Sequence, residues 1–131
     1  MFRISRVLET CLYATDLAAM ERFYGKVLGL SKMGAEYPRH VFFRVGPESM
    51  LLIFNPVETI KEQEVPSHGA HGPAHVAFAV EGDDLDECRT RLAEHGVAIE
   101  REIQWPGGGR SIYFRDPAGN SVEFATRRTW E

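Results

Sequence analysis

Two glutamates and one histidine stand where the sequence predicts short apolar strands. Glu9 lies in VLETCLYAT, His75 opens HVAFAV, and Glu123 lies in NSVEFAT. A buried carboxylate without a partner is costly, so Glu9 and Glu123 would need a cation beside them. A neutral imidazole is a common metal ligand. The three residue types together are therefore typical of a site for a divalent metal ion.

Strand alternation places these side chains on the strand faces that carry small residues. Valine and phenylalanine alternate with small residues in 74–81 and again in 120–126. Because successive side chains of a strand point to opposite faces, each strand has a bulky face and an open face. The open faces hold His75, Ala77 and Ala79 in the first stretch, Ser121, Glu123 and Ala125 in the second, and Glu9, Cys11 and Tyr13 near the N-terminus. We expect the bulky faces to pack under helices and the open faces to line a cavity.

The sequence contains two similar halves, each with the predicted element order βαβββ. The predicted strands span 7–15, 30–37, 40–46 and 50–56 around a helix at 16–29, and then 74–81, 97–105, 110–116 and 120–126 around a helix at 83–96. Residues 57–73 are polar and rich in Pro and Gly, which predicts a linker. A half of about 50 to 60 residues buries too little surface to be stably folded alone. We therefore predict an α+β fold and one domain over 1–131, in which module one (1–56) and module two (74–131) share a core.

The charge distribution argues against several partners. The formal net charge is −4, and Lys and Arg are scattered singly. Without a basic stripe we expect no nucleic acid and no membrane as partners. The N-terminal residues lack an apolar segment with a cleavage site, so a cytoplasmic location is expected. Cys11 and Cys88 form no CxxC pair, and we expect both to be reduced.

Several motifs resemble the vicinal oxygen chelate superfamily, which contains glyoxalase I, fosfomycin-resistance enzymes, extradiol dioxygenases and bleomycin-binding proteins. The motifs are DLAAMERFYGKVLGL, HVAFAV and YFRDPAGNSVEF, and the resemblance covers nearly the whole chain. It implies that the two βαβββ modules form an incomplete barrel and that the protein is a homodimer. It also implies metal ligands at Glu9, His75 and Glu123, and it puts Tyr113 where dioxygenases carry a tyrosine.

The sequence departs from this family at informative positions. The first ligand position is usually His, or Gln in some glyoxalases, and here it is Glu9. The resemblance to glyoxalase I implies a metal site with four ligands, one of them a carboxylate on the fourth strand. Here the fourth predicted strand, residues 50–56, reads MLLIFNP and has no carboxylate. We therefore do not expect glyoxalase I activity. One His and two Glu also differ from the two His and one carboxylate of extradiol dioxygenases.

The residues and the resemblance favour a metal-dependent enzyme that acts on a small oxygenated molecule. Oxygen-rich ligation suits Mn, Fe, Zn or Mg, and the metal would serve as a Lewis acid. Tyr113 is a candidate catalytic residue, and Arg110 or Arg44 is a candidate cation for an anionic group of the substrate. The alternative is a metal-free protein of the bleomycin-resistance type that sequesters a small molecule. We expect His68 and His71, in a glycine-containing stretch, to be solvated loop side chains.

The first prediction concerns folding and assembly, and because each half is small, we expect the two halves not to fold separately. We expect the intact chain to be a dimer with an isologous interface, as the resemblance implies. Light scattering at micromolar concentration measures the mass directly. A monomer mass would remove the dimer while leaving the fold untouched.

Overall fold

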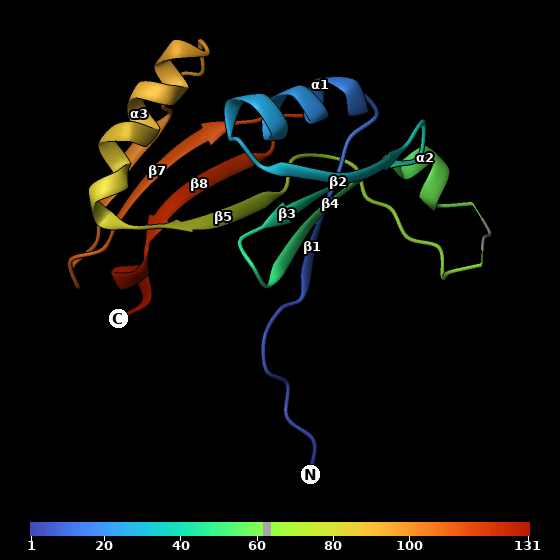
Figure 1. Ribbon diagram of the computed structural model, residues 1–131, viewed down its shortest axis with the longest axis horizontal. Helices are drawn as coiled ribbons and strands as arrows, with labels where there is room; N and C mark the ends of the chain where they lie inside the picture. The colour runs from blue at the N-terminus through green and yellow to red at the C-terminus, as the bar shows by residue number, and fades with distance from the viewer. Residues whose placement is uncertain (62–63) are drawn as a thin grey trace. The chain divides into compact units, whose positions relative to one another are not determined.

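The computed structural model describes residues 1–61 and 64–131 (Figure 1). The chain divides into two units, Met1–His71 and Gly72–Glu131, and the division falls inside the predicted linker. Each unit contains one four-stranded mixed sheet with helices, and neither sheet is closed. The predicted α+β class and the pair of βαβββ modules are confirmed. Among the described residues, no helix has the length and apolar character that crossing a bilayer requires.

The described residues of the first unit form four strands, two α-helices and a π-helical segment. These are β1 (Glu9–Tyr13), α1 (Leu17–Arg22), the π-helical Phe23–Val27, β2 (Ser31–Glu36), β3 (His40–Val45), β4 (Ser49–Phe54) and α2 (Pro56–Thr59). The strand order is β1-β4-β3-β2, with β1 parallel to β4 and the other pairs antiparallel. Asp16 caps α1 by accepting from the Ala19 N–H at 3.0 Å, and Gly29, at φ 77°, follows the helical segment.

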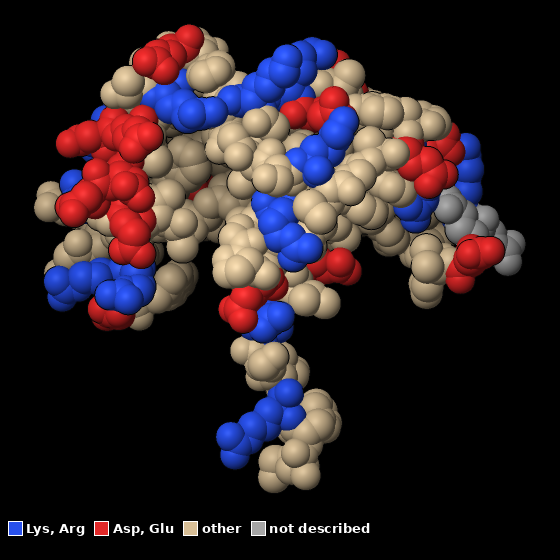
Figure 2. All heavy atoms as spheres, in the orientation of Figure 1, with Lys and Arg blue, Asp and Glu red and all other residues tan. Residues whose placement is uncertain are grey.

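The second unit repeats this plan. It contains β5 (His75–Val80), a 3-10 turn (Gly82–Asp84), α3 (Leu85–Glu94), β6 (Arg101–Gln104), β7 (Arg110–Arg115), β8 (Ser121–Thr126) and a C-terminal 3-10 turn (Arg127–Trp130). The strand order β5-β8-β7-β6 is that of the first unit, again with the first and last strands parallel. Acidic side chains gather at the start of α3, and on the face shown in Figure 2 basic side chains are interspersed with acidic ones.

The bulky strand faces form the core of each unit, as the alternation predicts. In the first unit, β3 and β4 contact α1, and their side chains Val41, Phe43, Leu51 and Ile53 are buried. In the second unit, Ile112, Phe114 and Val122 are buried, and so are Leu85 and Leu92 of α3. The opposite strand faces hold the polar candidates.

The predicted linker contains a short helix that the sequence analysis did not foresee. Asn55 caps α2, because its Oδ1 accepts from the Val57 N–H at 3.1 Å, and Pro56 stands at the start of the helix. Proline suits this position, since its missing N–H would have no partner there. Asn-Pro at the end of an apolar strand was the available signal.

A turn with two buried polar side chains connects β5 to β8 through hydrogen bonds. Asp116 Oδ1 accepts from the backbone N–H groups of Ala118 at 2.9 Å and Asn120 at 3.0 Å. Asn120 Nδ2 donates to Asp116 Oδ2 at 2.9 Å, and Asn120 Oδ1 accepts from the Ala74 N–H at 2.8 Å. The side chain of Asn120 therefore ties the turn to the residue that precedes His75.

This network predicts that Asn120→Ala destabilises the protein by about 3 kcal/mol, because it removes the hydrogen bonds of a side chain that is 1% exposed, one of them to the Asp116 carboxylate. Urea denaturation of the two proteins measures the loss. Glu94→Ala, at an exposed position of α3, is the control and should change stability by less than about 0.5 kcal/mol. Equal stability of Asn120→Ala and the wild type would show that the turn does not hold the strands.

Candidate metal site

The register of β5 and β8 brings two predicted ligands together on the open face of the second unit. His75 pairs with Ser121, and Ala77 pairs with Glu123, so the two candidates lie diagonally across a parallel strand pair. Their side chains meet, with 3.2 Å between His75 Nε2 and Glu123 Oε1. The Glu123 side chain is 8% exposed and the His75 side chain 51%. The pair is open to solvent on the imidazole side.

A backbone carbonyl determines the tautomer of His75. The ring atom Nδ1 lies 3.0 Å from the carbonyl oxygen of Ser121. A carbonyl oxygen only accepts hydrogen bonds, so Nδ1 carries a proton. In the neutral ring, Nε2 then has a lone pair, and this lone pair faces a carboxylate oxygen. Such an arrangement requires a proton or a metal ion between the two atoms, and the carbonyl-bound Nδ1 is the usual partner of a metal-binding Nε2.

The other oxygen of Glu123 is held from within the sheet. Ser111 Oγ donates to Glu123 Oε2 at 2.5 Å, and Trp105 Nε1 donates to Ser111 Oγ at 2.8 Å. Ser111 and Trp105 were not among the residues chosen from the sequence. The alternation of β7 puts Ser111 on the face of Tyr113, and this was the signal that could have found it.

Tyr113 lies beside this carboxylate. It is the cross-strand partner of Glu123, and its ring stacks on the His75 ring at 6.3 Å between centroids. Burial, and then the charge and hydrogen bonding of Glu123, raise the pKa of the Tyr113 hydroxyl. The hydroxyl is therefore protonated at neutral pH and can donate a hydrogen bond.

Glu9 belongs to the other unit and lies on its open face. It pairs with Met50 at the start of β1, two residues before Cys11. Burial and the negative charge of Glu9 raise the pKa of the Cys11 thiol. Among the described residues, no three His, Cys, Asp or Glu side chains form a cluster that could hold a metal ion. The structure thus brings together His75 and Glu123 within the second unit, and Glu9 as a ligand of the same ion stays a prediction.

The repeat shows which residue of the first unit corresponds to Glu123. Counted from Glu9, the residue two positions on is Cys11, and its partner on β4 is Leu52. Counted from His75, the residue two positions on is Ala77, and its partner on β8 is Glu123. Leu52 therefore stands at the duplicated position, and the first unit supplies no carboxylate there.

The open face of the first unit carries aromatic rings and His68. The Tyr13 hydroxyl lies 2.7 Å from His68 Nδ1, and the His68 ring packs edge-on against Phe54 at 4.7 Å. The expectation of a solvated His68 is wrong, because the backbone N–H of His68 donates to the Thr59 carbonyl at 3.0 Å and holds the residue near these rings. His71 is exposed, as expected.

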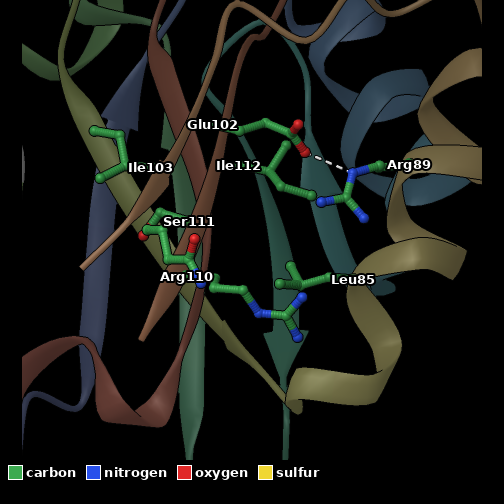
Figure 3. A pocket seen from close by; sticks show the side chains of 8 residues that line it. Leu85, Arg89, Glu102, Ile103, Arg110, Ser111 and Ile112 are labelled. Carbon is green, nitrogen blue, oxygen red and sulfur yellow. Dashed lines mark hydrogen bonds and ion pairs between the residues drawn. The ribbon is translucent and has the colours of Figure 1, made fainter. Parts of the chain in front are cut away.

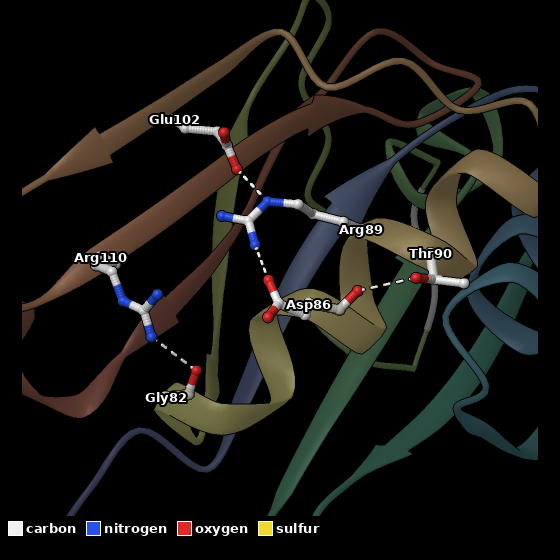
Figure 4. Close-up of polar contacts among 6 residues, drawn as sticks. All are labelled: Gly82, Asp86, Arg89, Thr90, Glu102 and Arg110. Carbon is white, nitrogen blue, oxygen red and sulfur yellow. Dashed lines mark hydrogen bonds and ion pairs between the residues drawn. The ribbon is translucent and has the colours of Figure 1, made fainter.

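The structure does not place Arg110 beside His75 and Glu123. Arg110 alternates with Ser111 along β7, and its Nη2 donates to the Gly82 carbonyl at 2.8 Å (Figure 4). It lines a pocket of about 380 Å³ with residues that include Leu85, Arg89 and Glu102 (Figure 3). In that pocket Arg89 Nε donates to Glu102 Oε1 at 2.5 Å. Arg110 therefore faces α3, not the open face.

The sequence matches the model of the Glyoxalase/Bleomycin resistance protein/Dioxygenase superfamily over residues 3–124. The chain therefore belongs to this superfamily. The predicted membership of the vicinal oxygen chelate group is confirmed.

Two curated relatives and one solved structure illustrate the relationship. A metallothiol transferase FosB from Bacillus licheniformis is 31% identical over 113 residues, which cover 86% of this chain and 69% of that protein. Another FosB, from Shouchella clausii, is 46% identical over 54 residues, which cover 40% of this chain and 37% of that protein. The crystal structure of a lactoylglutathione lyase from Agrobacterium tumefaciens is 40% identical, with a TM-score of 0.92 and 98% of each chain covered.

Proposed function

We propose that the protein is a metal-dependent enzyme that acts on a small oxygenated molecule, as a homodimer in the cytoplasm. The observation that carries this proposal is the 3.2 Å approach of His75 Nε2 to Glu123 Oε1. Because the Ser121 carbonyl engages the protonated Nδ1, Nε2 of the neutral ring has a lone pair directed at the carboxylate. A divalent cation satisfies both atoms and leaves the imidazole neutral.

The donor set suits a hard or borderline metal. His75 and Glu123 would hold it from the second unit, and we propose Glu9 as the third ligand, which would make the formal charge of the loaded site zero. Two carboxylates and one imidazole suit Mn, Fe, Zn or Mg. When bound, the metal would polarise a substrate oxygen as a Lewis acid. Tyr113, which lies beside Glu123, would help to orient the substrate.

The names of the relatives suggest that a thiol takes part. One relative is a lyase of lactoylglutathione, and two are metallothiol transferases. We therefore propose that the substrate is an oxygenated molecule that carries or receives a thiol. The stacked His75 and Tyr113 rings would form one wall of the substrate site.

A second candidate is a metal-free protein that binds a small molecule without chemistry. The aromatic side chains Tyr13 and Phe54, with His68 between them, favour it, because such a surface suits a planar ligand. Protein that contains no metal after purification, and that binds a ligand tightly without turnover, would support this candidate.

We predict that the protein does not isomerise the adduct of glutathione and methylglyoxal. Leu52 occupies the position where a second carboxylate could act as a proton-transfer base, and a base must lie within hydrogen-bond reach of its proton. Formation of the thioester product, followed by absorbance with added Mn(II) or Zn(II), measures this activity. An authentic lactoylglutathione lyase is the positive control, and robust turnover that Glu123→Gln abolishes would contradict the prediction.

The proposed metal site predicts that Mn(II) or Zn(II) raises the melting temperature of the wild type and that Glu123→Gln removes this response. A ligand at one hundred times its Kd stabilises the folded state by about 2.7 kcal/mol, which raises the melting temperature by several degrees. Thermal unfolding with EDTA and with each metal measures the shift.

Glu94→Gln is the matched control, since it removes an exposed carboxylate from α3 and should keep the full metal response. No response to metal in the wild type would refute the metal site and favour the metal-free binding protein.

A further inference from the structure

A chain of hydrogen bonds connects an indole to the carboxylate of Glu123. Trp105 Nε1 donates to Ser111 Oγ at 2.8 Å, and Ser111 Oγ donates to Glu123 Oε2 at 2.5 Å. Ser111 is 1% exposed and Glu123 is 6% exposed. The bond from Ser111 to Glu123 therefore lies away from bulk water, where a hydrogen bond to a carboxylate is strong, and the bond from Trp105 is partly buried.

The direction of each bond follows from the donor groups alone. An indole N–H can only donate, so the Ser111 oxygen must be the acceptor. The hydroxyl has one proton, and with the indole on its oxygen this proton is directed to Glu123 Oε2. Oε2 is thereby engaged within the sheet, and Oε1 is the oxygen that faces His75 Nε2.

The backbone around Trp105 keeps the indole in place. The Trp105 N–H donates to the Gly109 carbonyl at 2.7 Å, and the Gly108 N–H donates to the Trp105 carbonyl at 3.0 Å. A Cβ added at Gly109 would come within 2.4 Å of the Thr129 backbone nitrogen, so the C-terminal turn packs closely on this hairpin. Glycine is required there by the close approach of the two backbones.

We propose that Ser111, supported by Trp105, is a positioning residue for the metal ligand Glu123. The hydroxyl holds Oε2 and, together with Tyr113, limits the rotation of the carboxylate, so that Oε1 is the donor atom beside His75. The proposal rests on the proposed metal site and adds two residues to it. Mutation of a residue that hydrogen-bonds a metal ligand typically lowers metal affinity by about 10- to 100-fold.

The test measures metal affinity and not turnover. Titration calorimetry with Mn(II) and Zn(II) gives the Kd for the wild type and for Ser111→Ala, and we expect the variant to bind about 10- to 100-fold more weakly. Ser111→Thr keeps a hydroxyl and should recover much of the affinity. Trp105→Phe keeps the bond from Ser111 to Glu123, so its loss should be smaller than that of Ser111→Ala.

Thr126→Val is the matched control. Thr126 Oγ1 accepts from the Arg110 N–H at 2.9 Å between the same two strands, so this variant also loses a buried hydroxyl. We expect it to lower stability while its metal Kd stays within about twofold of the wild type, because Thr126 does not touch Glu123 or His75. If Thr126→Val weakened the metal as much as Ser111→Ala, the effect would be general destabilisation and the proposal would fail.

The outcomes of this test separate the positioning role from the metal site itself. Wild-type affinity in Ser111→Ala would overturn the positioning role and leave the metal site intact. Absence of metal binding in the wild type would instead overturn the proposed function, and the positioning role with it.

Discussion

The second unit is organised around a buried carboxylate. Glu123 is 6% exposed, and within the described part of the chain its partners are the Ser111 hydroxyl, the His75 ring and Tyr113, with no Lys or Arg among them. A buried charge without a counter-charge is unfavourable, so its polar contacts must be kept in register. The turn at Asp116 and Asn120 and the parallel pairing of β5 with β8 supply that register.

The two units share one plan but use their open faces differently. Strand register makes three positions of the first unit equivalent to three of the second. The equivalent pairs are Leu52 and Glu123, Phe42 and Tyr113, and His40 and Ser111. In the first unit the His40 ring stacks on Phe42 at 4.0 Å between centroids, where the second unit has the Ser111 hydroxyl and the Tyr113 ring. At the three positions the first unit thus has two rings and a leucine, and the second unit has two hydroxyls and a carboxylate.

Strand alternation and the internal repeat predicted the element order and part of the site. The period of two put His75 and Glu123 on open strand faces, and the structure brings them together because His75 pairs with Ser121 and Ala77 with Glu123. The same alternation argues against Arg110, which is one residue from Ser111 and therefore on the opposite face. Its choice from the sequence depended on charge alone.

The other misses depended on contacts between distant residues. His68 reaches Tyr13 across 55 positions, and Trp105 reaches Ser111 only because a glycine-rich hairpin folds it back. Short sequence patterns predict neither contact. A polar residue in a loop is predicted to be solvated unless the path of the backbone is known, and this is why the prediction for His68 was wrong.

The residue of β7 that donates a hydrogen bond to Glu123 Oε2 is a serine and not an arginine or lysine. A neutral neighbour is what a carboxylate that binds a cation requires. A cationic partner would neutralise Glu123 and compete with a metal for the same charge. A hydroxyl fixes the carboxylate without neutralising it, and the indole behind it fixes the hydroxyl. The negative charge of Glu123 is thus left to act at Oε1, on the side where the imidazole of His75 is half exposed.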